Sequence, residues 1–153
     1  MIGWPRRVIC RLLLATHFPL DLVIILLGTN DTKDYLHRTP RDIGVALSVL
    51  AGQVQTSAGG VGTTYPAPQV LLVSPPPLGD HPDPWFAEIF AGGRAKSLEL
   101  PRIYAALAAF GGSHFFDAGS VISTDGVDGV HLTAGNNRDL GAALAGRVRE
   151  ILA

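Results

Sequence analysis

Residues 21–31 read DLVIILLGTND, and this stretch decides the fold class. The residues from Leu22 to Leu27 are all apolar, and Gly28 follows them directly. A strand that is covered on both faces has this pattern, because neither of its faces contacts water. Such strands build parallel sheets, so the stretch predicts a parallel sheet with helices on both of its sides.

Similar signals predict the other elements. The run VLLV at residues 70–73 predicts a second strand, and Phe115 begins a short third one. Thr39-Pro40-Arg41-Asp42 is typical of a helix start, and we expect Gly59-Gly60 to end that helix. Further helices are predicted at residues 6–15, 84–91, about 96–110 (with a kink or a break at Pro101) and after the loop 117–135.

The order strand, helix, strand, helices, strand, helix predicts a three-layer α/β domain that spans residues 1–153. Hydrophobic residues make up 47% of the chain and charged residues 16%, a balance that favours a packed domain over disorder. The net charge of -1 argues against a nucleic-acid partner. The single cysteine, Cys10, excludes an intramolecular disulfide and a cysteine-rich zinc site.

The N-terminal segment has some features of a signal peptide, since Arg6 and Arg7 precede apolar residues. However, Arg11 interrupts the apolar run and no small-x-small cleavage site follows. The longest apolar run is far shorter than the roughly 20 residues that a membrane span needs. We therefore expect a soluble, cytoplasmic protein with no membrane partner.

Chemistry is expected at the carboxyl ends of the strands, where ligands bind in open α/β sheets. Asp128 and His131 follow the third strand, and a carboxylate at this spacing can hold one imidazole nitrogen and leave the other as a base. Asn30 follows the first strand and could donate to an oxyanion. The alternatives are an incidental pair in a solvated loop, and a turn in which Asn30 or Asp31 caps the next segment.

Taken together, these blocks resemble a known family. GTND (28–31) after an apolar strand and DGVH (128–131) before the last helix are similar to signature blocks of the SGNH (GDSL-like) hydrolases. The segments LATHFPLDLVIILLGTNDTK (14–33), SAGGVGTTYPAP (57–68) and FFDAGSVISTDGVDGVHLT (115–133) resemble its arylesterase/acyltransferase branch. The resemblance extends from about Leu14 to the C-terminus.

The resemblance implies a flavodoxin-like α/β/α fold, a small ester or alcohol as substrate, no cofactor, and a homo-oligomer. It assigns His131 as general base, Asp128 as its orienting carboxylate and Asn30 as oxyanion donor. The substrate-binding residues that the resemblance implies are Gly28, Lys33, Trp85, Phe86, Phe90 and Val130. For the three aromatic residues among them the alternative is plain helix packing, and for Lys33 it is an exposed surface lysine.

The family's Gly-Asp-Ser block, whose serine is the nucleophile, is absent from the sequence, and so is the block that supplies an oxyanion-hole glycine. By analogy, the chain lacks the first two strands of a five-stranded sheet. A base without a nucleophile cannot form an acyl-enzyme, so we expect impaired activity. The strand at 22–27 would lose a neighbour, and an apolar edge strand predicts self-association. Substitute nucleophiles to consider are Ser74, Ser120, Ser123 and Cys10.

Several interpretations remain open. The protein could be an ordinary esterase whose true start lies upstream, or a non-catalytic α/β module that binds an acyl ligand or a partner chain. Glycines 59, 60 and 62 follow a helix rather than a strand and no Gly-Lys-Ser/Thr is present, so a nucleotide site is disfavoured. A metal site is also disfavoured, because the spacing fits neither an EF-hand nor a zincin helix; its ligands would be Asp117, Asp125, Asp128 and His131.

Overall fold

The computed structural model describes residues 6–59, 64–126 and 128–153. Its three strands are parallel and lie in the order β1 (Leu22–Leu26), β2 (Gln69–Ser74), β3 (His114–Asp117). The central strand β2 is buried from Val70 onwards, which explains why its run of apolar residues is continuous. β1 and β3 form the two edges of this sheet.

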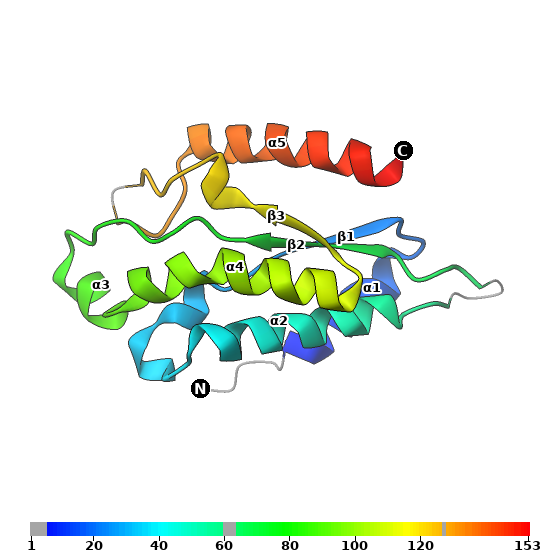
Figure 1. Ribbon diagram of the computed structural model, residues 1–153, viewed down its shortest axis with the longest axis horizontal. Helices are drawn as coiled ribbons and strands as arrows, with labels where there is room; N and C mark the ends of the chain where they lie inside the picture. Colours follow the sequence, from blue (N-terminus) through cyan, green and yellow to red (C-terminus); the bar gives the residue numbers. More distant parts are fainter. Residues whose placement is uncertain (1–5, 60–63, 127) are drawn as a thin grey trace.

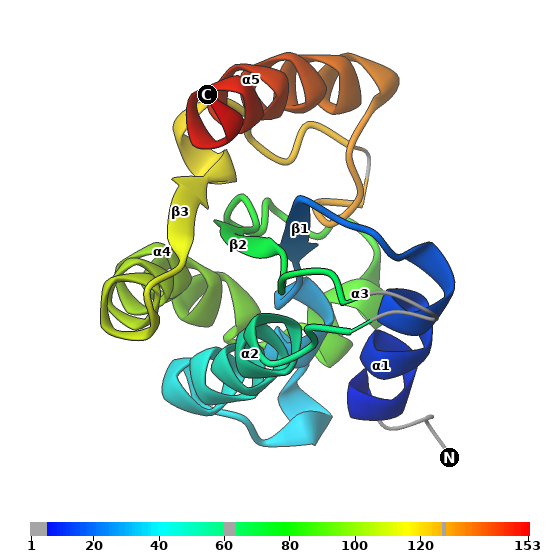
Figure 2. The same cartoon turned by 90° about the vertical axis from the view of Figure 1, so that its right-hand side faces the viewer.

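Helices cover both faces of the sheet, as Figures 1 and 2 show. One face carries α5, and the opposite face carries α1, α2 and α4. The predicted three-layer α/β order is therefore confirmed. The helices are α1 (Arg6–His17), α2 (Pro40–Gln55), α3 (Pro84–Ile89), α4 (Gly93–Gly111) and α5 (Ala134–Leu152), with 3-10 turns η1 (Thr29–Thr32), η2 (Asp34–Leu36) and η3 (Ala118–Ser120).

Two hydrophobic cores lie on the two faces of the sheet. Successive side chains of a strand point to opposite faces, so β2 contributes to both cores. Val70 and Leu72 pack toward α1, α2 and α4, whereas Leu71 and Val73 pack toward α5 with Leu140. Burial on both faces is the reason that β2 lacks the alternation of polar and apolar residues typical of a half-exposed sheet.

The start of α2 follows the prediction closely. Thr39 caps the helix: its hydroxyl accepts from the backbone N–H of Asp42, and the Asp42 carboxylate accepts from the backbone N–H of Thr39. The predicted end at Gly59-Gly60 is wrong, because the helix stops at Gln55, and Gly60 lies outside the described residues. The hydroxyl of Thr56 donates to the Gly52 carbonyl oxygen at 2.7 Å and satisfies one of the last carbonyls instead.

α4 differs from its prediction in two ways. It begins at Gly93 rather than near residue 96, and Pro101 lies inside it without splitting it. Leu100, Ile103 and Tyr104 are buried against the core on both sides of the proline. This burial holds the two halves in one helix despite the missing proline N–H.

The N-terminal helix α1 runs to His17, two residues beyond its predicted end. The His17 ring extends it, because Nδ1 lies 2.9 Å from the Leu13 carbonyl oxygen. Residues 1–5, the start of the segment with signal-peptide features, lie outside the described residues. Within the described ranges, every helix is too short or too polar to cross a membrane.

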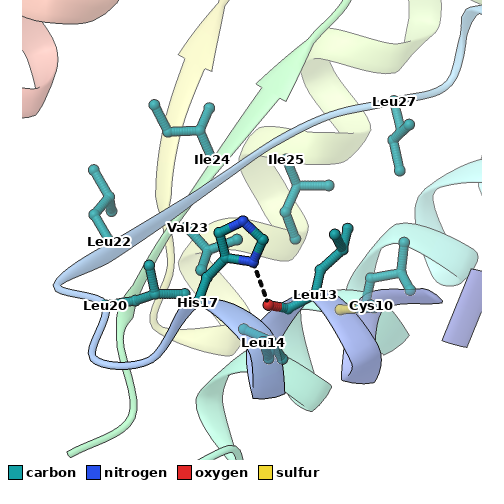
Figure 3. Close-up of a pocket in the computed structure, with 11 residues that line it drawn as sticks. Cys10, Leu13, Leu14, His17, Leu20, Leu22, Val23, Ile24, Ile25 and Leu27 are labelled. Carbon is teal, nitrogen blue, oxygen red and sulfur yellow. Dashed lines mark hydrogen bonds between the residues drawn. The ribbon is translucent and has the colours of Figure 1, made fainter. Parts of the chain in front are cut away.

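The outer edge of β1 borders an apolar groove above α1 (Figure 3). Ile24, Leu26 and Leu27 are 41%, 37% and 40% exposed, which is high for large apolar side chains of a parallel sheet. The groove has a volume of about 620 Å³. Its lining residues come from α1, from β1 and the segments beside it, and from α2: Cys10, Leu13, Leu14, His17, Leu20, Leu22, Val23, Ile24, Ile25, Leu27 and Leu50.

Candidate active site

A carboxylate–imidazole pair lies in the turn before α5. Asp128 Oδ2 is 2.5 Å from Nδ1 of His131. The other carboxylate oxygen, Oδ1, accepts from the backbone N–H groups of Val130 and His131, both at 2.9 Å. These three contacts fix the carboxylate within its own turn. Val130, expected in the substrate channel, thus contributes its backbone to the carboxylate's orientation.

The electrostatics of the pair favour an ionised Asp128. The hydrogen bond from His131 and the backbone N–H groups of His131 and Val130 hold the pKa of the Asp128 carboxyl well below its usual range. The carboxylate can only accept, so Nδ1 of His131 carries the proton. His131 is 76% exposed, and its Nε2 makes no hydrogen bond to any residue that the structure describes. The ring therefore presents a lone pair to solvent or substrate.

The turn itself depends on two glycines. Gly129 has φ of +70°, and a Cβ there would lie 2.2 Å from the Asp80 carbonyl oxygen. A Cβ on Gly126 would lie 2.2 Å from the His131 carbonyl oxygen. Both contacts are far too short, so the turn needs glycine at these positions. The backbone N–H of Gly79 donates to the Gly129 carbonyl oxygen at 2.8 Å and docks the turn on the segment that follows β2.

Aromatic side chains in α3 and at its C-cap connect this turn with the segment after β1. Phe86 meets the His131 ring edge-on, with 6.5 Å between ring centroids, and stacks on Phe90 at 6.1 Å. Lys33 Nζ lies 5.5 Å from the centroid of the Phe90 ring, a cation–π distance. The structure thus brings together His131, Phe86, Phe90 and Lys33, which sequence reasoning had grouped.

Trp85 is placed differently from its two aromatic neighbours. The Asp83 carboxylate caps α3 by accepting from the backbone N–H groups of Trp85 and Phe86, at 2.9 and 3.1 Å. The Trp85 side chain is 65% exposed, whereas Phe90 is only 3% exposed. Within the described ranges, Trp85 makes no ring contact with Phe86, Phe90 or His131. The helix-packing alternative fits Phe90, and Trp85 lies at the surface of the site.

The end of β1 forms a compact turn around GTND. Gly28 has φ of +131°, and a Cβ on it would lie 2.4 Å from the Tyr104 hydroxyl. That hydroxyl donates to the Leu27 carbonyl oxygen at 2.9 Å. The backbone N–H of Asp31 donates to the Gly28 carbonyl oxygen at 2.9 Å. Because it has no side chain, Gly28 lets the backbone of this turn pass close to the Tyr104 hydroxyl.

Asn30 and Asp31 take opposite positions in that turn. Asp31 is 1% exposed and forms an ion pair with Arg38, while Asn30 is exposed. No hydrogen bond joins Asn30 to Asp128 or His131 among the described residues. The role of Asn30 as an oxyanion donor thus stays a prediction that rests on its place at the carboxyl end of β1.

The structure gives the substitute nucleophiles other roles. Ser74 is fully buried and donates to Asp117 Oδ1 at 2.8 Å. Ser120 donates to the Asp117 carbonyl oxygen at 2.7 Å, and Ser123 is exposed. Burial raises the pKa of the Cys10 thiol, which is the opposite of what activates a cysteine. None of these residues makes a described hydrogen bond to His131.

The acidic residues weighed as metal ligands serve as caps and anchors. Asp117 accepts from Ser74 and from the Gly119 backbone N–H. Asp125 accepts from the Thr133 hydroxyl at 2.7 Å and from the Asn136 side chain. In the part of the chain that the structure describes, no three His, Cys, Asp or Glu residues are grouped to hold a metal ion. Gly60, Val61 and Gly62, considered for a nucleotide site, lie outside the described residues.

Sequence reasoning missed one residue beside the pair, His81. Its Nδ1 lies 2.9 Å from the Asp128 carbonyl oxygen, and its ring stacks on Phe90 with 5.5 Å between centroids. His81 lies in the segment that follows β2, so it lies at the same edge of the sheet as the turn that carries Asp128. That shared edge was the one sequence signal that could have identified it.

Comparisons with known proteins agree on the family. The fold matches the aryl esterase of M. smegmatis with a TM-score of 0.92 and 66% sequence identity, over 95% of this chain and 67% of that chain. A carbohydrate acetylesterase from Sinorhizobium meliloti matches with a TM-score of 0.92 and 56% sequence identity, over 95% of this chain and 67% of that chain. A carbohydrate acetylesterase family member from the same organism matches with a TM-score of 0.90 and 38% sequence identity, over 95% of this chain and 68% of that chain. No protein-family model and no curated protein sequence matches the chain.

The three-stranded parallel sheet flanked by helices matches the α/β fold of SGNH-type esterases over part of their length. At this level of identity and coverage, the chain belongs to the family of SGNH-type aryl esterases and carbohydrate acetylesterases. The chain spans 67% of the length of the first two of these solved proteins.

Proposed function

We propose that this chain supplies the base, the orienting carboxylate and an oxyanion donor of a serine-type ester hydrolase or acyltransferase. The observation that carries the proposal is the 2.5 Å contact between Asp128 Oδ2 and His131 Nδ1, which leaves Nε2 exposed beside Phe86. The similarity to an aryl esterase and to a carbohydrate acetylesterase supports acetate esters of aryl alcohols or of carbohydrates as the substrates that we propose for this chain.

In this proposal, His131 acts twice. Its Nε2 accepts the proton of the attacking hydroxyl and later returns a proton to the leaving alcohol. Asp128 holds Nδ1–H and stabilises the imidazolium that forms in between. Asn30, at the carboxyl end of β1, donates its amide N–H to the oxyanion. Water or a second alcohol then takes the acyl group.

The acyl pocket would form around the aromatic residues of α3. Phe86 offers an apolar surface beside His131, the buried Phe90 stacks on Phe86, and Lys33 is held against the Phe90 ring. Val130 and the exposed Trp85 would border the entrance, and Gly28 would let the backbone of the turn approach the substrate closely. An apolar surface of this size suits a short acyl group or an aryl alcohol.

The nucleophile is the element that the sequence does not provide, since Gly-Asp-Ser does not occur in its 153 residues. We expect the purified chain to hydrolyse a short-chain aryl acetate no faster than its His131→Ala variant. Turnover that disappears in the variant would contradict the absence of a working nucleophile. His37→Asn is a matched control, because His37 is also an exposed imidazole and asparagine tolerates its left-handed backbone, with φ of 49°.

A second experiment tests the site itself. The chain extended at its N-terminus by the Gly-Asp-Ser segment of a related esterase should hydrolyse the same ester. His131→Ala should then reduce kcat by about 10³-fold or more, and His37→Asn should leave it unchanged. Equal activity in all three extended proteins would remove His131 from the mechanism.

The edge of β1 favours a second, non-catalytic interpretation in which the chain is an association module. We propose that two copies pair through β1. A strand with an unpaired edge is a template for another strand, and antiparallel pairing of two identical strands has the two-fold symmetry of a closed dimer. The exposed Ile24, Leu26 and Leu27 would then lose contact with water.

Sedimentation or size-exclusion measurements over a range of concentrations test this association. We expect a dimer or a larger species for the native chain and a monomer for Ile24→Lys, since a lysine on an edge strand opposes pairing. Val45→Lys on α2, which is 57% exposed, controls for the added charge. A native chain that stays monomeric at every concentration would contradict the proposal.

A further inference from the structure

We propose that His81 is a positioning residue for the Asp128–His131 pair and holds, as a neutral imidazole, the backbone of the turn that carries both residues. The inference rests on the proposed function, because it treats that pair as the base and its orienting carboxylate. It adds a residue that lies in the segment after β2, outside the DGVH and GTND blocks.

The first support is the contact between His81 and the main chain of Asp128. His81 Nδ1 lies 2.9 Å from the Asp128 carbonyl oxygen, across 47 positions of the sequence. A carbonyl oxygen only accepts, so Nδ1 carries the proton and donates. This bond holds the peptide group that follows Asp128, where Gly129 has φ of +70°. The bond from Gly79 N–H to the Gly129 carbonyl oxygen, at 2.8 Å, anchors the next peptide.

The second support is a closed circuit of contacts around the pair. His81 stacks on Phe90 at 5.5 Å, Phe90 stacks on Phe86 at 6.1 Å, and Phe86 meets the ring of His131 at 6.5 Å. His131 is bonded to Asp128, whose carbonyl oxygen returns to His81. His81 is thus the link that ties the turn to the aromatic wall of α3.

The third support is the other nitrogen of the His81 ring. Nε2 is buried and has no hydrogen-bond partner among the described residues. A protonated ring would place a second donor and a positive charge at this buried point, which is costly. A neutral ring with the proton on Nδ1 donates to the Asp128 carbonyl oxygen. It places neither a second donor nor a charge at the buried Nε2, where only a lone pair lacks a partner.

Two substitutions separate the donor from the ring. His81→Phe keeps an aromatic ring to stack on Phe90 and places a C–H where the unpartnered Nε2 lies, but it has no donor. His81→Asn loses the ring and keeps an N–H donor near the position of Nδ1. If the donor positions the turn, asparagine should preserve the native behaviour and phenylalanine should not.

Amide hydrogen exchange measured by NMR on the full chain reads out the turn without any need for catalysis. The N–H groups of Val130 and His131, which donate to Asp128 Oδ1, should exchange about 3- to 10-fold faster in His81→Phe, the range expected for one hydrogen bond. The N–H groups of β2 should be unchanged, and His81→Asn should exchange like the native chain.

The outcomes decide the proposal separately from the enzymatic function. Unchanged exchange at Val130 and His131 in His81→Phe overturns it, and so does a parallel increase in β2, which would show a role in global stability alone. If His81→Phe does not fold, ¹⁵N NMR of the native imidazole decides: a proton on Nδ1 of His81 supports the proposal, and a proton on Nε2 overturns it. Absence of esterase activity in the extended chain would refute the proposed function and leave these results intact.

Discussion

Replacing Gly129 with alanine should undock the turn that carries Asp128 and His131. The left-handed backbone, with φ of +70°, costs about 1–2 kcal/mol once a Cβ is present. The added Cβ would lie 2.2 Å from the Asp80 carbonyl oxygen and 3.0 Å from the Gly79 carbonyl carbon, so the segment must move. Moving it breaks the bond from Gly79 N–H to Gly129, which contributes about 0.5–1.5 kcal/mol.

The sum is a destabilisation of about 1.5–3.5 kcal/mol, or a Tm lower by roughly 3–14 °C for a chain of this size. Gly141→Ala is the matched control, because Gly141 lies in α5 and a Cβ there meets no atom within 4 Å. That variant should gain about 0.5–1 kcal/mol, since alanine favours the helix. Denaturant unfolding measures both variants, and a Gly129→Ala protein as stable as Gly141→Ala would refute the reasoning.

Three further substitutions test other parts of the structure by denaturant unfolding. Thr39→Ala removes the side-chain cap of α2 that accepts from the Asp42 N–H, and should cost about 1 kcal/mol; no loss would show that the cap is dispensable. Tyr104→Phe leaves the Leu27 carbonyl without its 2.9 Å donor and should cost about 1–2 kcal/mol, whereas a value below about 0.5 would contradict the role of this bond. The lowered pKa of Asp128 stabilises the folded chain above the usual aspartate pKa of about 4, and this contribution is lost as the pH falls through the folded-state value. Asp128→Asn should therefore lower the free energy of unfolding at neutral pH and make it fall less steeply in acid than in the native chain. The same pH dependence of unfolding in the variant and the native chain would exclude the effect.

Much of the fold could be predicted because its signals are local. The apolar run of β2 is buried by helices on both faces, and the sequence shows this directly, whereas β1 forms the sheet edge and leaves Ile24 and Leu26 partly exposed. The cap of α2 was recognisable because Thr39 and Asp42 interact across three positions. Of the kink or break predicted at Pro101, the break is wrong, because burial of Leu100 and Tyr104, which depends on the whole core, outweighs a local preference.

The same difference separates the parts of the candidate site. Asp128 and His131 are three positions apart, and their contact needs only the turn between them. His81 reaches Asp128 across 47 positions, so no spacing in the sequence could predict that bond. Phe86 lies in α3 and Phe90 caps its C-terminus, yet the placement of Phe86 beside His131 depends on how α3 packs against the turn.

The GTND block shows why a motif can be recognised from sequence while the separate parts of its residues depend on the structure. The sequence left open whether Asn30 or Asp31 capped the turn, and the structure gives the two residues different positions. Asp31 is 1% exposed and paired with Arg38, an arrangement that a buried carboxylate requires. Its backbone N–H also closes the turn onto the Gly28 carbonyl oxygen at 2.9 Å. Because Asp31 anchors the turn from inside, the neighbouring side chain of Asn30 is left exposed at the carboxyl end of β1, the edge at which ligands bind in open α/β sheets and at which we predict that it donates to the oxyanion.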